Sequence, residues 1–87
     1  MLTIDDKRRS FTYAQKVGYL LRLTRHRAKL KQETVAIEAG ISRTHLSHIE
    51  RGQVDVSLSV LLCVVTAIGT KMGAFFAELE ELIRELG

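Results

Sequence analysis

Residues 32–52 read QETVAIEAGISRTHLSHIERG, a run in which two short helical patterns meet at Gly40. Gly40 has no Cβ and can take the positive φ that a sharp turn requires, and Ser42 can cap the second helix, which stops at Gly52. Ala36 must be small, because the second helix crosses closely above it. The positions facing inward are Val35, Ala36, Ala39, Ile41, Leu46 and Ile49. The pattern predicts a helix-turn-helix unit, and an ordinary helical corner is the alternative.

A longer helical pattern precedes this unit. Thr12 and Gln15 have the spacing of a capping box, which predicts that a helix starts at Tyr13. Apolar or small residues then recur at helical spacing to near Lys29, where we expect the helix to end. They are Val17, Leu20, Leu21, Thr24 and Ala28.

Two further helices are expected after the unit. Ser57 starts a fourth helix that runs to Ile68, and Gly69 follows it. Thr70 can cap a fifth helix, which is strongly apolar on one side. The predicted fold class is therefore all-α, with five helices and the helix-turn-helix unit at the second and third.

Composition agrees with one small helical domain. A chain of 87 residues rarely divides its core, and the absence of proline, six glycines and 6% aromatic residues speak against a β-sandwich or barrel. The longest uncharged stretch, residues 56–70, is shorter than the ~20 apolar residues that cross a bilayer. The N-terminus lacks the pattern of a secretion signal, and the single cysteine fits a reducing compartment. We expect a cytoplasmic protein with no membrane partner.

Charge is divided between the two ends of the chain. Residues 1–31 hold nine Lys or Arg against two Asp, a balance of +7, whereas residues 56–87 have a balance of −2. A basic half suggests a polyanionic partner, and nucleic acid is the commonest one for a small basic domain. A solvated positive face without a partner is the alternative.

The third helix carries outward side chains that can reach base edges, at Arg43, Thr44, Ser47 and His48. Arg43 is the strongest candidate, because a guanidinium can hold both O6 and N7 of a guanine. Thr44 offers a methyl group to thymine, and His48 can donate to a purine. The alternative is that Arg43 contacts only phosphate and that the other two are idle surface residues.

The pattern resembles the Cro and phage-repressor type of helix-turn-helix proteins, the Xre family. The resemblance covers residues 17–69 and rests on Val17-Gly18, Leu21-Arg22, Arg25, Leu30, Gln32-Glu33, Val35-Ala36, Ala39-Gly40-Ile41-Ser42, Leu46-Ser47, Ile49-Glu50-Arg51-Gly52 and Ala67-Ile68-Gly69. It implies a five-helix domain that binds double-stranded operator DNA as a homodimer and regulates transcription, without a cofactor. Restriction-modification controller proteins, antitoxins and small phage repressors share this layout, and the sequence does not separate them.

The resemblance also implies roles for individual residues. Base contacts fall on Arg43, Thr44, Ser47 and His48, and phosphate contacts fall on Gln32, Lys31, Arg51 and Gln53. Arg25 and Glu50 occupy the positions of an internal ion pair that links the first helix to the end of the third. For the phosphate contacts, the alternative is plain solubilising surface residues.

The sequence departs from the family at three positions. Lys29 stands where a glycine often ends the first helix, so we expect that helix to end less sharply. Lys31 replaces the usual Ser or Thr cap of the second helix, and Val56 replaces a frequent proline.

The chain is expected to divide into three parts. Residues 1–12 are predicted to be a flexible basic arm, residues 13–69 the DNA-binding domain, and residues 70–87 a C-terminal helix used for dimerisation. Lys7, Arg8 and Arg9 in the arm can reach a minor groove, and a disordered basic tail is the alternative.

The last two helices carry more apolar residues than one small core requires, which predicts a homodimer interface. Its expected residues are Val60, Cys63, Phe75, Phe76, Leu79, Leu82, Ile83 and Leu86. Two recognition helices would then lie on successive major-groove faces, about 34 Å apart. The alternatives are that the fifth helix folds back onto the monomer, or that the chain is an adaptor or antitoxin whose apolar helices bind a protein such as a toxin or polymerase.

No catalytic or metal centre is expected. His45 and His48 stand three apart on one helix, but no further Cys or carboxylate completes a four-ligand shell. Ser47, His48 and Glu50 point in different directions from one helix and cannot form a proton relay. The sequence therefore predicts a protein that is not an enzyme and holds no metal.

Overall fold

The computed structural model describes residues 11–86, which form five α-helices and, within that range, no strand. The helices are α2 (Tyr13–Arg27), α3 (Gln32–Ala39), α4 (Arg43–Glu50), α5 (Leu58–Ile68) and α6 (Met72–Leu86). The predicted all-α fold of five helices is confirmed. Residues 1–10 of the predicted basic arm, with Lys7, Arg8 and Arg9, lie outside the described residues.

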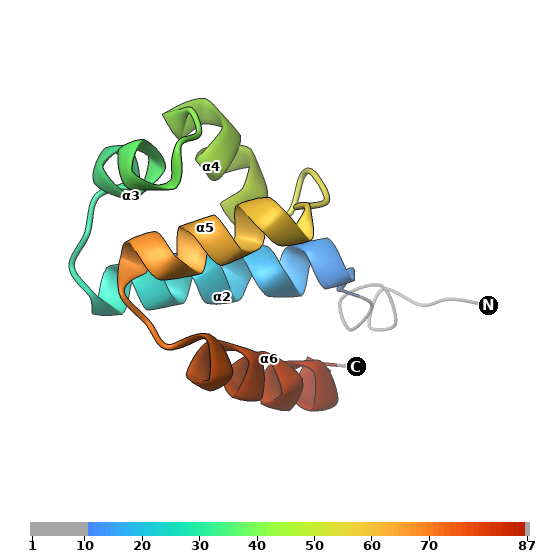
Figure 1. Cartoon of the computed structure of the whole chain (residues 1–87). Coiled ribbons are helices and arrows are strands. Elements are labelled where there is room, and N and C mark those ends of the chain that lie inside the picture. The colour runs from blue at the N-terminus through green and yellow to red at the C-terminus, as the bar shows by residue number, and fades with distance from the viewer. Residues whose placement is uncertain (1–10, 87) are drawn as a thin grey trace.

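The helices form a small bundle around two central elements (Figure 1). Helices α2 and α5 lie side by side in the middle, with α3 and α4 on one side of them and α6 on the other. The buried core residues come from all five helices; they are Leu20, Leu21, Val35, Ala36, Leu46, Ile49, Leu61, Val64, Val65, Ile68, Phe75 and Leu79. Because each large apolar side chain contributes roughly 1.5–3 kcal/mol on burial, this cluster is the main source of stability.

Three helices begin where the sequence predicts a cap. The Thr12 hydroxyl accepts from Gln15 N at 3.0 Å and the Gln15 side chain accepts from Thr12 N at 2.9 Å, which completes the capping box. Ser42 and Ser57 accept from the backbone N–H groups three residues further on, at 3.0 and 3.2 Å. Each cap satisfies a donor that the first turn of a helix leaves without a partner.

The end of α2 differs from the expectation drawn from the sequence. Lys29 takes a left-handed conformation, with φ 59°, and α2 ends at Arg27. Lys29 N donates to the His26 carbonyl at 3.0 Å, and Leu30 N donates to the Arg25 carbonyl at 3.2 Å. These two bonds close the helix as a glycine would. The prediction of a less sharply ended helix is therefore wrong.

The start of α6 also differs from the prediction. The first intrahelical hydrogen bond runs from Phe75 N to the Lys71 carbonyl, at 3.0 Å, so Lys71 rather than Thr70 is the residue that caps the helix. Gly69, with φ 90°, ends α5, and Thr70 is part of the short connection that redirects the chain.

The backbones of α2 and α4 are in direct contact. A Cβ at Gly18 would collide with the Ile49 carbonyl oxygen and lie 2.8 Å from the Glu50 carbonyl oxygen. Just beyond α4, Gly52 combines φ 70° with a position where a Cβ would lie 2.6 Å from Gln15 Cα. Both glycines allow α4 to be held tightly against α2, which fixes its direction relative to the bundle.

Within residues 11–86, no single helix has both the length and the hydropathy to cross a membrane. Only helices α5 and α6 taken together have the required length and hydropathy, and the two are bent by 112° relative to each other.

Candidate nucleic-acid interface

Helix α4 has one buried and one exposed side. Leu46 and Ile49 are buried in the core, whereas Arg43, Thr44 and His48 are exposed. Ser47 is half-buried between them. The four predicted base-contacting residues therefore share the outer side of one short helix, where donors and acceptors can meet base edges.

A buried ion pair anchors the C-terminal end of α4. Arg25 Nε donates to Glu50 Oε2 at 2.7 Å, and Arg25 Nη2 donates to Glu50 Oε1 at 2.9 Å. Both side chains are largely withdrawn from solvent, with 9% and 2% of their surface exposed. The two parallel bonds fix orientation as well as contact, as bidentate guanidinium–carboxylate pairs do.

This pair is part of a wider hydrogen-bond network. Gln32, the first residue of α3, donates from Nε2 to Glu50 Oε1 at 3.0 Å. Arg25 Nη1 donates to the Leu30 carbonyl at 2.8 Å, and Arg25 Nη2 lies 3.3 Å from His26 Nε2, which can accept when the ring is neutral. The network joins α2, the turn after it, α3 and α4, so the two helices of the motif are presented as one unit.

The residues predicted to contact phosphate surround this network. Lys31 and Arg51 are exposed at the N-terminal end of α3 and the C-terminal end of α4, and Gln53 is exposed two residues later. Gln32 is half-buried and its amide N–H group is directed at Glu50. Lys31 makes no side-chain capping bond, so its ammonium group is not held at the helix end.

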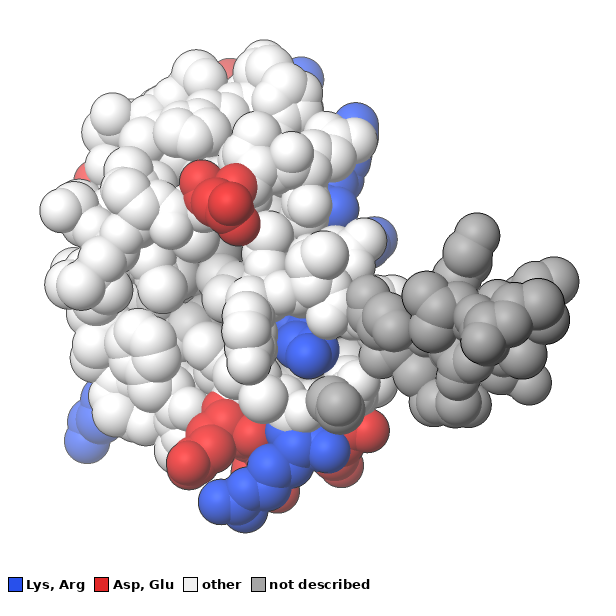
Figure 2. Space-filling view, turned by 90° about the vertical axis from the view of Figure 1, so that its right-hand side faces the viewer, with Lys and Arg blue, Asp and Glu red and all other residues white. Residues whose placement is uncertain are grey.

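Positive charge is unevenly neutralised over the described part of the chain. On α6, Arg84 pairs with Glu81 at 3.0 Å, and Glu78 pairs with Arg27 of α2 at 2.7 Å. Acidic and basic side chains accordingly lie together at the lower edge of Figure 2, over α6. Around α4 the cations Arg22, Lys31, Arg43 and Arg51 make no ion pair with another residue of the range 11–86. Within the described range, the α4 side therefore presents several cations that no carboxylate pairs.

Two cavities adjoin this surface. The first is a polar notch of about 330 Å³ between α2 and α4. It is lined by Arg22, Arg25, His26, Gln32, Arg43, Ser47, Glu50 and Arg51. Sequence reasoning placed Arg43, Ser47, Gln32 and Arg51 in the site and missed Arg22 and His26. Arg22 lies one helical turn after Gly18 on α2, but the contact of Gly18 with α4 that brings Arg22 to the notch forms only in the folded chain.

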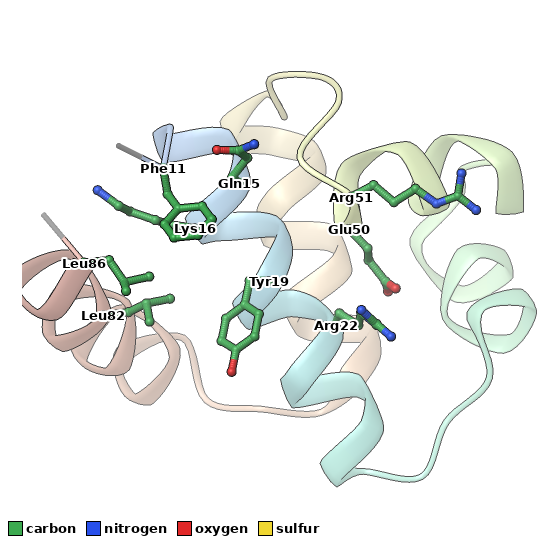
Figure 3. Close-up of a pocket in the computed structure, with 9 residues that line it drawn as sticks. All are labelled: Phe11, Gln15, Lys16, Tyr19, Arg22, Glu50, Arg51, Leu82 and Leu86. Carbon is green, nitrogen blue, oxygen red and sulfur yellow. The ribbon is translucent and has the colours of Figure 1, made fainter. Parts of the chain in front are cut away.

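The second cavity is a groove of about 560 Å³ between α2 and α6 (Figure 3). Phe11, Tyr19, Leu82 and Leu86 give it apolar walls, and Arg22, Glu50 and Arg51 lie at the end nearest α4. Lys16 also lines it; this residue is 6% exposed, and its ammonium group lies 5.1 Å from the centre of the Tyr13 ring. The sequence pattern did not reveal that this lysine is buried.

The residues predicted to form a dimer interface lie in different environments. Phe75 and Leu79 are buried in the core of the single chain and are not available to a partner. Cys63 is exposed in a separate depression between α3 and α5, together with Glu38. Val60, Phe76, Leu82, Ile83 and Leu86 are half-buried. The available apolar surface of α6 is therefore narrower than the sequence suggested.

Within residues 11–86, no group of three or more His, Cys, Asp or Glu side chains is positioned to hold a metal ion. His45 and His48 are both exposed on α4.

Residues 16–79 match the helix-turn-helix domain family, which accounts for most of the chain. This chain belongs to that helix-turn-helix family. The immunity repressor protein of Bacillus phage phi105 is a relative, with 39% identity over 69 residues, 79% of this chain and 47% of the repressor. The helix-turn-helix chain thus spans about half the length of that relative.

Solved structures of the restriction-modification controller protein C.Esp1396I share the fold of this helix-turn-helix chain. The wild-type controller has a TM-score of 0.79 and 23% identity, over 85% of this chain and 97% of the controller. The same values hold for its tetramer in complex with its natural 35-base-pair operator and for the protein bound to a 25-base-pair operator site. The resemblance to the Cro and repressor type is confirmed.

Proposed function

We propose that this chain is a transcriptional regulator that reads specific DNA sequences and binds inverted-repeat operators as a homodimer. The observation that carries the proposal is the exposed polar side of α4, held rigid by the Arg25–Glu50–Gln32 network. The helix-turn-helix family and the operator complexes of the controller protein support it. A rigid helix with outward polar side chains is what base readout in a major groove requires.

In this proposal, the residues of α4 read bases and those around it hold the backbone. Arg43 donates two N–H groups of its guanidinium to O6 and N7 of one guanine, and Thr44, Ser47 and His48 contact the neighbouring bases. The phosphate contacts are Gln32, Lys31, Arg51 and Gln53. In this proposal the Gln32 amide contacts a DNA phosphate while its hydrogen bond to Glu50 is kept.

Dimerisation is proposed through the C-terminal helix. A single module of this size contacts DNA over a limited area, so a second copy raises both affinity and the length of sequence that is read. Leu82 and Leu86 present apolar surface beside the groove in Figure 3, and Phe76 and Ile83 are half-buried on the same helix. The tetrameric operator complex of the controller protein supports an oligomeric assembly.

The proposal is tested by selecting bound duplexes from a randomised DNA pool with the wild-type chain, Arg43→Ala and Lys31→Ala. We expect the wild type to enrich inverted half-sites about one helical turn apart. Arg43→Ala should lose preference at one base pair of each half-site, worth about 1–3 kcal/mol of discrimination. Lys31→Ala should keep the motif and lower the slope of log affinity against log salt by about 0.9.

The outcomes separate the functions. Unchanged selectivity in Arg43→Ala would show that α4 does not read bases through this residue. Salt-sensitive binding by the wild type without an enriched motif would replace the regulator with a nonspecific binder or a protein-binding adaptor.

A further inference from the structure

We propose that the polar notch between α2 and α4 is the seat of one DNA backbone phosphate and that Arg22 of α2 is the residue that holds it. The inference rests on the proposed function, because it names a contact to the same DNA. It goes beyond that function by adding a donor from outside the helix-turn-helix unit. The reasons are the shape of the notch, its charge, and the way α2 is fixed against α4.

The notch brings together side chains from three helices and the residue that follows α4. Its cavity of about 330 Å³ has room for a phosphate group and ordered water. Arg22 and His26 approach from α2, Arg43 and Ser47 from α4, and Arg51 from the residue after it. Phosphate contacts from several elements fix the orientation of a protein on DNA, whereas a single exposed cation does not.

The charges of the notch favour an anion. The charge of Arg25 is matched by Glu50, and each oxygen of that carboxylate already accepts a hydrogen bond. Arg22, Arg43 and Arg51 make no ion pair with any residue in the described range. A phosphate entering the notch therefore meets three guanidinium groups that no carboxylate of residues 11–86 pairs, and guanidinium is well suited to bidentate phosphate contacts.

The position of Arg22 is fixed by the backbone contact described above. Gly18 and Arg22 are four residues apart, so they share the face of α2 that touches the end of α4. In Figure 3, Arg22 and Arg51 lie on either side of the Glu50 side chain. The close approach of α2 to α4 fixes the backbone position of Arg22 relative to α4. A phosphate held by Arg22 therefore has a defined place relative to the DNA bases that α4 reads.

The inference is tested with Arg22→Gln and the matched control Lys71→Gln, which removes an exposed cation just before α6, on the opposite side of the bundle. Affinity for the duplex selected by the wild-type chain is measured as salt is varied. Arg22→Gln should bind about tenfold more weakly at low salt, with a salt slope lower by about 0.9. Lys71→Gln should keep the wild-type affinity and slope, and Arg22→Lys should recover the slope. Thermal unfolding checks that each variant is folded.

A second measurement locates the contact. Single phosphates of the duplex are replaced with uncharged methylphosphonates, one at a time. We expect the wild type to lose affinity at one particular phosphate in each half-site, and Arg22→Gln to be insensitive to replacement of that same phosphate. If Arg22→Gln behaves as Lys71→Gln in both measurements while the wild type still selects a motif, the notch is not a phosphate seat and the proposed function stands. If the wild type selects no motif, both proposals fail.

Discussion

Glu50 accepts hydrogen bonds from two other helices through both of its carboxylate oxygens. It is the last residue of α4, so the partners it holds determine how the C-terminal end of α4 is fixed. Removing one member of a buried pair leaves the other charge without compensation, which costs more than the pair itself contributes.

We expect Glu50→Gln to lower the free energy of unfolding by about 3 kcal/mol, because Arg25 remains buried with its charge unmatched. The measurement is urea denaturation. The control is the double variant Arg25→Met with Glu50→Leu, which removes both charges and should recover most of the loss. A single variant within about 1 kcal/mol of wild type would mean that water reaches Arg25 and that the pair is not a determinant of the fold.

At the scale of elements, the helix starts were readable from sequence because a cap is a local event. Thr12, Ser42 and Ser57 each bond to a backbone group three residues away, and short-range spacing captures that. The start of α6 was not predicted correctly: Thr70 has the chemistry of a cap, but α6 begins at Met72 and its first backbone hydrogen bond is accepted by the Lys71 carbonyl. The notch was missed for a related reason: Arg22 and Glu50 are far apart in sequence and meet only in the folded chain.

The turn that ends α2 places Lys29 in a left-handed conformation, which is unfavourable for a residue with a Cβ. In the folded state, a residue with a Cβ in the left-handed region costs about 1–2 kcal/mol. Replacing it with glycine removes this cost but also raises the conformational entropy of the unfolded chain, which cancels part of the gain in stability. We expect Lys29→Gly to raise the free energy of unfolding by about 0.5–1 kcal/mol.

The matched control is Ala28→Gly, one residue earlier, where φ is −82°. At that position glycine relieves no strain, so the protein should be less stable, by up to about 1 kcal/mol. Urea denaturation of the two variants checks the sign. A loss of stability in both would show that Lys29 contributes a contact worth more than the strain.

The contact between α2 and α4 predicts opposite effects for two glycines. Gly18→Ala should lower the free energy of unfolding by about 1–3 kcal/mol, because the added methyl group collides with the Ile49 carbonyl. Gly73→Ala in α6 should raise it by about 0.5–1 kcal/mol, because a Cβ there meets no atom within 4 Å. Thermal unfolding compares the two. If both substitutions changed the free energy of unfolding by the same amount, α2 and α4 could move apart without a loss of stability.

At the scale of the whole molecule, the fold class, the ion pair and the outer side of α4 could be predicted, whereas the distribution of apolar surface could not. Helical spacing identifies apolar faces but does not say which of them the chain itself covers. Phe75 and Leu79 fill the core, while Leu82 and Leu86, on the same helix, border a groove. Only the packing of α6 against α2 separates these two sets.

The location of Leu82 and Leu86 beside the groove leads to a prediction about dimerisation. Leu82→Glu combined with Leu86→Glu should convert the proposed dimer to a monomer in light scattering, because a carboxylate in an apolar interface is not solvated. The control is Leu58→Glu, at a leucine that is 65% exposed on α5; its mass should be unchanged. Circular dichroism should show folded helices in both. A dimer that survives the double variant would move the interface away from α6.

The close approach of α4 to Gly18 belongs to a set of contacts that attach α4 to the bundle, and this set is distinct from the side chains that α4 exposes. Everything that attaches the helix to the bundle points inward: the backbone contact at Gly18, Leu46 and Ile49 in the core, and Glu50 in its network. Arg43, Thr44 and His48 take no part in that attachment. The outward positions can therefore be exchanged together with little effect on the melting temperature. If α4 reads bases as proposed, grafting the corresponding side chains of another family member should direct the protein to that member's operator.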